Sequence, residues 1–243
     1  MTAIVLASIA VLLGALVRGY TGFGASMFWV ASLSLVYPPA SVVPTVLALE
    51  VIASIALLPG AFRHVQWRSM RWMLASSVAT MPLGILLLST LPERQMRVVV
   101  AASILLATIA VACGVKLARE PGPMSALTAG SVSGLVNGST GMGGPPAILL
   151  YFSSRSSTEL GRATLIAYFL GTDAIGFAMM AAYGLVDTPV MTHTLVFAPL
   201  ALGGIALGQQ IFKRTGGTGF RKVVLGVLLA LSLATLGRAV LFG

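Results

Sequence analysis

Long apolar runs, separated by short charged clusters, dominate this 243-residue sequence. Hydrophobic residues make up 57% of the chain and charged residues only 9%, against about 25% charged residues in a typical soluble domain. The apolar residues fill whole segments rather than one face, so the pattern predicts helices that lie in a lipid bilayer. We therefore expect an all-α polytopic membrane protein without a soluble domain. Continuous spans are predicted at 42–61, 70–91, 96–117, 162–184, 190–212 and 221–241.

Two further apolar segments are interrupted by glycine-rich breaks. The first consists of 3–17, the break 18–24 and 26–36; the second consists of 125–136, the break 137–146 and 147–152. A fifteen-residue helix rises about 22 Å, which is less than the hydrocarbon thickness of about 30 Å. We therefore expect half-helices that enter and leave the bilayer from one side, as re-entrant hairpins. Two short crossings are the alternative.

The two breaks share a pattern, which indicates an internal duplication. The first reads Arg18-Gly-x-Thr-Gly-x-Gly, and the second reads Asn137-Gly-x-Thr-Gly-x-Gly, 119 positions later. Downstream, Glu50 and Asp173 fall at similar places in the helices that follow. A further match joins Met96-Arg97-x-Val99-Val100 to Phe220-Arg221-x-Val223-Val224.

The distribution of Lys and Arg predicts that two halves, 1–119 and 120–243, are inverted within one integrated membrane domain. If each broken segment enters and leaves on one side, each half makes three crossings, and this odd number reverses the second half. One face then carries 11 basic residues and the other 3, whereas a continuous crossing by each broken segment gives 8 and 6. The positive-inside rule favours the uneven distribution and places both termini outside a bacterial-type inner (plasma) membrane. The cytoplasmic loops are then 61–71, 116–123, 153–162 and 213–222.

Composition and charge argue against several other classes of protein. The net charge of +9 comes from basic residues spread over the loops, not from a stripe of the kind that binds nucleic acid. The single cysteine, Cys113, provides neither a disulfide nor a metal cluster. No cleavage site follows the apolar N-terminus, so residues 1–25 are expected in the mature protein. The sequence has no Walker A loop, and we expect neither ATP hydrolysis nor a cofactor.

The paired breaks are the best candidates for a substrate site near the bilayer midplane. Matched helix breaks in two halves are typical of secondary transporters, because irregular backbone at membrane depth needs protein or a cavity around it. A half-helix that begins after such a break presents free N–H groups and the positive end of its dipole, which favours a small anion. The alternative is that the glycines only allow close helix packing. The predicted substrate-binding residues are Arg18, Gly19, Thr21, Gly22, Gly24, Asn137, Gly138, Ser139, Thr140, Gly141, Gly143 and Gly144.

Three ionisable residues fall at membrane depth. Arg18 lies in the first break, and a charge at this depth is a functional hypothesis by default. It either binds the anion, pairs with Glu50 or reaches to the membrane interface. Of the six acids, only Glu50 and Asp173 fall in mid-helix, and a desolvated carboxylate can take up a proton. Either is a candidate for proton coupling, with a structural role as the alternative; coupling by Na⁺ is left open.

These residues resemble the sulfite exporter TauE/SafE family, also called the toluene sulfonate uptake permease family. That family has two homologous halves and a glycine-rich turn early in each half, often followed by proline. The first turn here departs from this pattern, since Ala25 and Ser26 stand where the second turn has Gly144 and Pro145. The two half-sites are therefore expected to contribute unequally. The matching stretches are Gly14-x-x-x-x-Gly19-x-x-Gly22-x-Gly24 and Gly134-x-x-x-Gly138-x-x-Gly141-x-Gly143-Gly144-Pro145.

The resemblance implies a permease for sulfur oxyanions or organosulfonates, such as sulfite or sulfoacetate. It leaves the direction of transport open, because members are proposed as exporters or as importers. Membrane lipid is the other expected partner, and a homo-oligomer is compatible with the sequence. The alternatives are a passive anion channel and a non-transporting membrane subunit. An intramembrane hydrolase built on Ser139 and His193 is disfavoured, because Ser139 does not lie in a G-x-S-x-G elbow.

Overall fold

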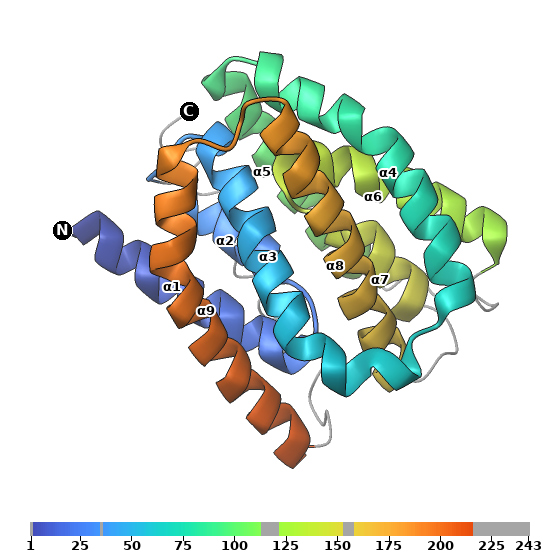
Figure 1. The fold of residues 1–243 in the computed structure, drawn as a ribbon. Helices are drawn as coiled ribbons and strands as arrows, with labels where there is room; N and C mark the ends of the chain where they lie inside the picture. The colour runs from blue at the N-terminus through green and yellow to red at the C-terminus, as the bar shows by residue number, and fades with distance from the viewer. Residues whose placement is uncertain (1, 35, 113–121, 153–157, 216–243) are drawn as a thin grey trace.

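The computed structural model describes residues 2–34, 36–112, 122–152 and 158–215 of the chain (Figure 1). Every regular element in these residues is helical, which confirms the predicted all-α fold. The predicted span 221–241, Cys113 and most of the loop 116–123 lie outside the described residues. The elements are α1 Thr2–Thr21, α2 Ala25–Leu33, α3 Pro39–Ala61, the 3-10 helix η1 Phe62–His64, α4 Trp67–Thr90, α5 Glu93–Ala112, α6 Pro123–Thr140, α7 Gly144–Phe152, α8 Thr158–Ala182 and α9 Thr188–Thr215.

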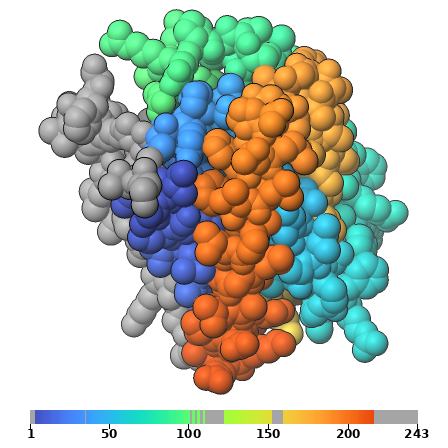
Figure 2. Space-filling view, turned by 60° about the vertical axis from the view of Figure 1, so that its left-hand side comes forward, coloured from blue at the N-terminus to red at the C-terminus, as the bar shows by residue number. Residues whose placement is uncertain are grey.

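Five of the described helices are long and apolar enough to cross a bilayer: α1, α3, α4, α8 and α9. Large apolar side chains are exposed along their outer faces, and Leu6 on α1, Leu83 on α4 and Leu195 on α9 are each more than half exposed. Figure 2 shows one such face, on which α9 lies beside α1. Exposed apolar faces on helices of this length are what contact with lipid requires.

The helices that precede the two glycine-rich breaks are longer than the sequence predicts. α1 has 20 residues and α6 has 18, so they rise about 30 Å and about 27 Å. Both helices continue into the break and end only at the left-handed glycines Gly22 and Gly141. The predicted half-helix at 3–17 is therefore too short, since α1 is long enough to cross the hydrocarbon region. Short helices follow the breaks instead: α2 and α7 have nine residues each.

Glycines bring two pairs of helices into close contact. α1 packs against α9, where a Cβ atom on Gly208 would lie 2.2 Å from the carbonyl oxygen of Leu16. α4 packs against α6 in the same way, and a Cβ atom on Gly134 would lie 2.0 Å from the carbonyl oxygen of Ser77. Such distances leave no room for a side chain, so the backbones touch as in small-residue interfaces of other membrane proteins.

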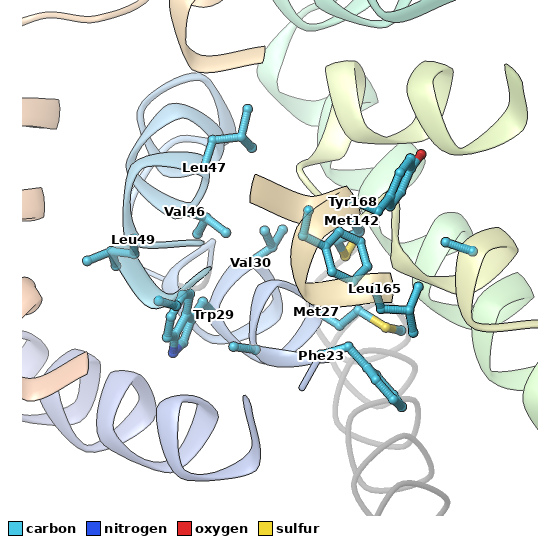
Figure 3. Close-up of a cluster of buried hydrophobic side chains, with 14 of the residues drawn as sticks. Phe23, Met27, Trp29, Val30, Val46, Leu47, Leu49, Met142, Leu165 and Tyr168 are labelled. Atoms are coloured by element: carbon cyan, nitrogen blue, oxygen red, sulfur yellow. The ribbon is translucent and has the colours of Figure 1, made fainter. Parts of the chain in front are cut away.

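The centre of the molecule is formed by α3 and α8, which pack against each other. The short helices α2 and α7 lie against this central pair. Figure 3 shows that Val30 of α2, Leu47 of α3 and Leu165 of α8 belong to one buried apolar cluster. Trp29 is fully buried, and its Nε1 donates to the carbonyl of Val11 at 2.9 Å, which fastens α2 to α1. This packing encloses both glycine breaks in the protein interior.

Candidate functional site

The two breaks have the same backbone geometry. The chain leaves α1 at Gly22, whose φ is 82°, and leaves α6 at Gly141, whose φ is 68°. In each break the glycine N–H donates to the carbonyl four residues earlier, at 2.7 Å from Gly22 to Arg18 and at 2.9 Å from Gly141 to Asn137. Only glycine adopts this left-handed conformation without strain, so both helices end at equivalent positions. α2 and α7 then begin three residues later.

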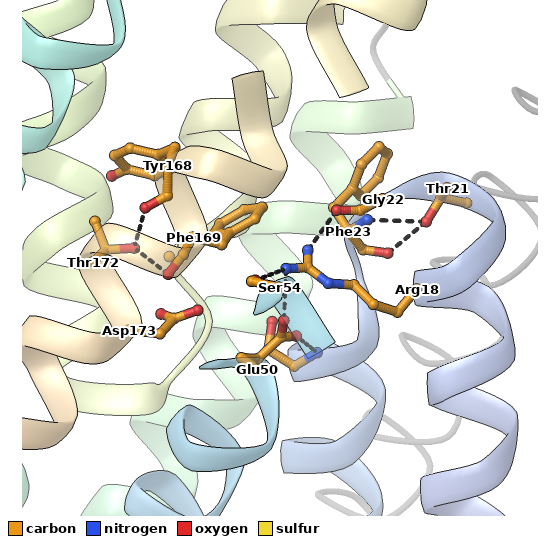
Figure 4. A network of polar contacts seen from close by, with 12 residues as sticks. Arg18, Thr21, Gly22, Phe23, Glu50, Ser54, Tyr168, Phe169, Thr172 and Asp173 are labelled. Carbon is orange, nitrogen blue, oxygen red and sulfur yellow. Dashed lines mark hydrogen bonds and ion pairs between the residues drawn. The ribbon is translucent and has the colours of Figure 1, made fainter. Parts of the chain in front are cut away.

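Arg18 lies in the last turn of α1, where its guanidinium is fully buried. Its Nη1 donates to the carbonyl of Gly22 at 2.5 Å, and its Nη2 donates to the hydroxyl of Ser54 at 2.7 Å. The same Nη2 forms an ion pair with Oε2 of Glu50 at 3.0 Å (Figure 4). Phe169 of α8 covers the guanidinium, with 5.0 Å between Cζ and the ring centroid. The predicted pairing of Arg18 with Glu50 is therefore present.

The Glu50 carboxylate also lies at the N-terminus of α2. Its Oε1 accepts the backbone N–H of Ser26 at 2.8 Å, and the side chain is only 3% exposed. A helix N-terminus attracts anions through its free N–H groups and its dipole. A carboxylate of the protein itself thus binds where the sequence predicts an external anion.

The second break is built around Asn137 in place of an arginine. The Asn137 Nδ2 donates to Oδ1 of Asp173 at 2.8 Å, and its Oδ1 accepts the N–H of Gly143 at 3.1 Å. The Ser133 hydroxyl donates to the Gly143 carbonyl at 2.5 Å and accepts the Tyr168 hydroxyl at 2.7 Å. The other carboxylate oxygen of Asp173, Oδ2, is buried and has no hydrogen-bond partner among the described residues. Among the described residues, no arginine forms an ion pair with this carboxyl group, although Arg18 lies within electrostatic range of it.

The contacts of Arg18 and Asn137 refine the predicted similarity in position of Glu50 and Asp173. Arg18 bonds Ser54, Asn137 bonds Asp173, and each pair is separated by 36 positions. The repeat offset of 119 therefore matches Asp173 with Ser54, and it matches Glu50 with Phe169. The two carboxylates lie one helical turn apart in the pattern of the repeat, so they are not counterparts.

A second difference separates the N-termini of α2 and α7. The counterpart of Ser26, which donates its N–H to Glu50, is Pro145, and Pro146 follows it. Proline has no N–H, so the start of α7 lacks two of the donors that an anion needs. Its neighbour there is apolar, because the ring of Phe169 approaches Gly144. The described residues thus offer the donors of an anion site at the first break only, where Arg18 also lies.

The other predicted contact residues are mostly occupied by the protein itself. Gly19 is a packing residue, since a Cβ atom there would lie 2.2 Å from the Ile205 carbonyl oxygen. Gly138 packs against α4 in the same way, with 2.4 Å to the Met81 carbonyl oxygen. The packing alternative thus describes these two glycines. The hydroxyls of Thr21, Ser139 and Thr140 all donate to backbone carbonyls of their own helix.

Sequence reasoning missed Arg162, which the apolar pattern places in a basic loop. It lies in α8, and its Nη2 donates to the carbonyl of Gly19 at 2.9 Å. A Cβ atom on Gly22 would lie 2.6 Å from its Cγ, so the side chain lies directly on the first break. Its guanidinium also covers the ring of Phe212 at 4.4 Å. No local signal marks this role, because the contact joins positions 143 apart.

The residues suggested for a hydrolase do not form a catalytic pair. The Ser139 hydroxyl donates to the carbonyl of Leu135 at 2.9 Å. The ring of His193 packs on Tyr37, with 4.4 Å between centroids, and on Phe197, with 6.1 Å. Each is explained by its own local packing, so the structure gives no support to nucleophilic chemistry.

Comparison with known proteins agrees with a membrane protein built of apolar helices. Residues 6–235 match the family described as Sulfite exporter TauE/SafE. The chain belongs to this TauE/SafE family. TauE/SafE proteins are membrane exporters and not enzymes, which also removes the hydrolase alternative.

A curated relative carries the same family name. The TauE/SafE chain is 25% identical over 220 residues to the probable sulfite/organosulfonate exporter TauE of Cupriavidus necator. The matched region covers 87% of this chain and 85% of that protein. No solved structure matches the chain.

Proposed function

We propose that this protein is a secondary transporter of sulfur-containing anions such as sulfite or organosulfonates, with alternating access around a site near the bilayer midplane. Membership of an exporter family supports the transport of a sulfur anion, and the name of the Cupriavidus necator relative supports this class of substrate. The substrate binds at the first glycine break. Its negative charge is balanced by Arg18.

The observation that carries this proposal is the buried guanidinium of Arg18 beside the N-terminus of α2. A charged group at this depth in a membrane protein is expensive, and it persists where a function needs it. The guanidinium offers a planar fork of donors that matches the oxygens of a sulfonate or sulfite. The N–H groups at the start of α2 add uncharged donors on the same side.

Alternating access follows from the burial of the site. Of the twelve predicted contact residues, only Gly24 is partly exposed, so an anion reaches Arg18 only after neighbouring helices move apart. The left-handed glycines of the two breaks, Gly22, Gly24 and Gly141, are natural hinges for such a movement. Transporters with broken helices commonly open by movement of one repeat against the other.

The proposed mechanism uses the two inverted halves, 1–119 and 120–243. α2 and α7 begin and end at positions 119 apart, which supports the duplication. Inversion is supported by the connections: the α3–α4 connection lies at one end of the molecule, and its counterpart between α8 and α9 lies at the opposite end (Figure 1). Arg63 lies in the α3–α4 connection, and Arg68 and Arg71 follow at the start of α4, so this end belongs to the cytoplasmic face by the positive-inside rule.

Transport is coupled to protons through a buried carboxyl group. Glu50 and Asp173 are the two candidates, and both are almost fully buried. Each can exchange a proton when the site opens to water, which links the movement of the anion to a proton gradient. Coupling to Na⁺ predicts instead that accumulation follows a sodium gradient at constant pH.

Substitution of Arg18 tests the site. We expect Arg18→Gln to abolish accumulation of sulfite and of an organosulfonate by proteoliposomes. It should also abolish the rise in melting temperature that these anions cause in the purified protein, because a ligand stabilises only the state that binds it. The matched control is Arg63→Gln in η1, outside the site, which should behave as the native protein.

Three outcomes would contradict parts of the proposal. A stable Arg18→Gln protein with native anion binding would remove Arg18 from the site. Stabilisation by simple carboxylates alone would remove the sulfur-containing substrate. A flux that ignores both pH and sodium gradients would identify a passive anion channel in place of a coupled transporter.

A further inference from the structure

The contacts of the Glu50 carboxylate are those that a substrate anion needs. One oxygen accepts the N–H of Ser26 at the start of α2, and the other forms an ion pair with Arg18. Oε1 therefore accepts a hydrogen bond, and Oε2 forms an ion pair without a hydrogen bond, with the groups that the proposed function assigns to a sulfonate. A substrate that binds to these donors cannot do so while the carboxylate remains in place.

The guanidinium of Arg18 retains one unused donor. Its Nε is buried and has no hydrogen-bond partner among the described residues, although Nη1 and Nη2 are both engaged. An uncompensated donor on a buried cation is costly. A tetrahedral oxyanion has more acceptor oxygens than a carboxylate, so it satisfies this guanidinium more completely than Glu50 does.

The second repeat forms its turn without a carboxylate at the position of Glu50, although Asp173 lies one helical turn away. Phe169 stands at the position that corresponds to Glu50, and Pro145 stands at the position of Ser26. The second break adopts the same backbone turn with these apolar residues. The carboxylate and the helix N–H that it accepts are therefore an addition to the first break, where the cation is.

We propose that Glu50 is a tethered competitor of the substrate, which holds the anion site between Arg18 and α2 and releases it only as the protonated acid. This inference rests on the proposed function and specifies how its site is regulated. A proton from the aqueous phase binds the Glu50 carboxylate, the ion pair with Arg18 breaks, and one substrate oxyanion takes its place. When the anion leaves, the Glu50 proton returns to the aqueous phase and the ion pair forms again. One proton therefore moves with each anion.

Few charged groups of the described residues face Glu50, so few of them influence its protonation. From α1 it meets Arg18, and from α8 it meets Asp173, which lies within electrostatic range of both. Of the two arginines of α5, Arg97 is engaged with Glu93 and with the carbonyl of Ser34, and Arg94 is exposed. The histidine of α9, His193, packs on aromatic rings. Among the described residues, the charge of Glu50 thus depends first on Arg18 and Asp173, and Arg162 of α8 adds a second positive charge beside Arg18.

The experiment is a binding titration at several pH values with the full-length protein in detergent. Ethanesulfonate is the probe, because it keeps a single negative charge between pH 5 and 8. We expect the native protein to bind it more tightly as the pH falls, approaching about tenfold per pH unit where Glu50 titrates. Glu50→Gln keeps the size of the side chain but cannot compete as an anion. It should bind the sulfonate with an affinity that does not change with pH and is at least that of the native protein at low pH.

The control is Glu93→Gln, which makes the same chemical change in the exposed ion pair with Arg97. It should retain the native pH dependence.

Native binding that does not vary with pH would overturn the inference, and this measurement needs no variant to fold. It would also be overturned if Glu50→Gln bound more weakly than the native protein at every pH, or if the pH dependence survived in Glu50→Gln and disappeared in Asp173→Asn. In all three cases anion binding persists, and the proposed function stands. Folded native protein that binds neither ethanesulfonate nor sulfite at any pH would instead refute the proposed function.

Discussion

Arg162 contacts the first glycine break from the other half of the molecule. Its Nη2 caps the carbonyl of Gly19 near the end of α1, and its aliphatic part covers Gly22. Carbonyls in the last turn of a helix have no partner within the helix, and a cation beside them is favoured by the helix dipole. Arg162 therefore links the end of α1 to the start of α8 and adds a second positive charge to the region of Arg18.

Replacement of Arg162 by glutamine should weaken this link. A hydrogen bond to a charged group contributes about 1.5–3 kcal/mol to stability, and we expect a loss of this order in the unfolding free energy. The unfolding free energy of Arg162→Lys should lie between those of the native protein and of Arg162→Gln, because lysine keeps the charge but loses the flat contact with Phe212. Denaturant unfolding in detergent measures both. A fully stable Arg162→Gln protein would show that the contact is dispensable.

The helices are held together by two glycine-lined contacts that recur in the two halves. α1 with α9, and α6 with α4, each join the first helix of one half to the fourth α-helix of the other. Because no side chain separates the backbones, each contact fixes the distance between its helices closely. The contacts lie immediately before the glycine breaks, so they position the helix ends from which Arg18 and Asn137 project.

Two glycines of α9 provide a matched test of this contact. Gly208→Ala would put a methyl group 2.2 Å from the carbonyl oxygen of Leu16, so the helices must separate. We expect a loss of about 1–3 kcal/mol, typical of overpacking. Gly203→Ala has nothing within 4 Å of the new methyl group and should leave stability unchanged or improve it, because alanine favours the helix. Thermal unfolding compares the two variants, and equal melting temperatures would contradict a tight α1–α9 contact.

At the scale of the whole molecule, the pairing of halves creates a site that neither half contains. Arg18 and Glu50 come from the first half, whereas Phe169 and Arg162 of the second half cover the same break. The first break therefore carries the positive charge, while the second carries Asp173 without an arginine. Under the proposed function, this asymmetry gives the transporter one anion site, which lies at the first break.

Membrane orientation is tested by labelling single cysteines in a protein whose Cys113 is replaced by serine. Arg63→Cys in η1 lies on the proposed cytoplasmic face, and Thr188→Cys, at the start of α9, lies on the opposite face. In intact cells a membrane-impermeant maleimide should label the second position and not the first. The reverse result would contradict the predicted orientation, and labelling of both positions would contradict the topology.

Periodic and compositional signals in the sequence predict most of the architecture. Apolar runs longer than 18 residues identify spanning helices because a bilayer imposes the same length on each of them. The repeated glycine pattern locates both breaks, since only glycine enters the left-handed conformation freely. The predicted helix boundaries before the breaks come too early, because glycine is tolerated in the last turn of a helix and each helix ends only at its left-handed glycine. The sequence places Glu50 and Asp173 at similar positions in their helices, and the repeat offset of 119 puts them one helical turn apart. Asp173 corresponds to Ser54, because each of these two residues bonds the break residue of its own half.

Sequence alone determined that the chain is an α-helical membrane protein with two glycine breaks, because membrane insertion and left-handed turns depend on local composition. Only the tertiary structure decided which groups meet at those breaks. Arg162 reaches Gly19 across 143 positions, and Ser26 reaches Glu50 across 24. Such contacts depend on how helices cross, and the crossing is set by backbone contacts at glycines whose partners lie far away in the chain. For the same reason, the presence of a protein carboxylate in the predicted anion position became visible only in the folded molecule.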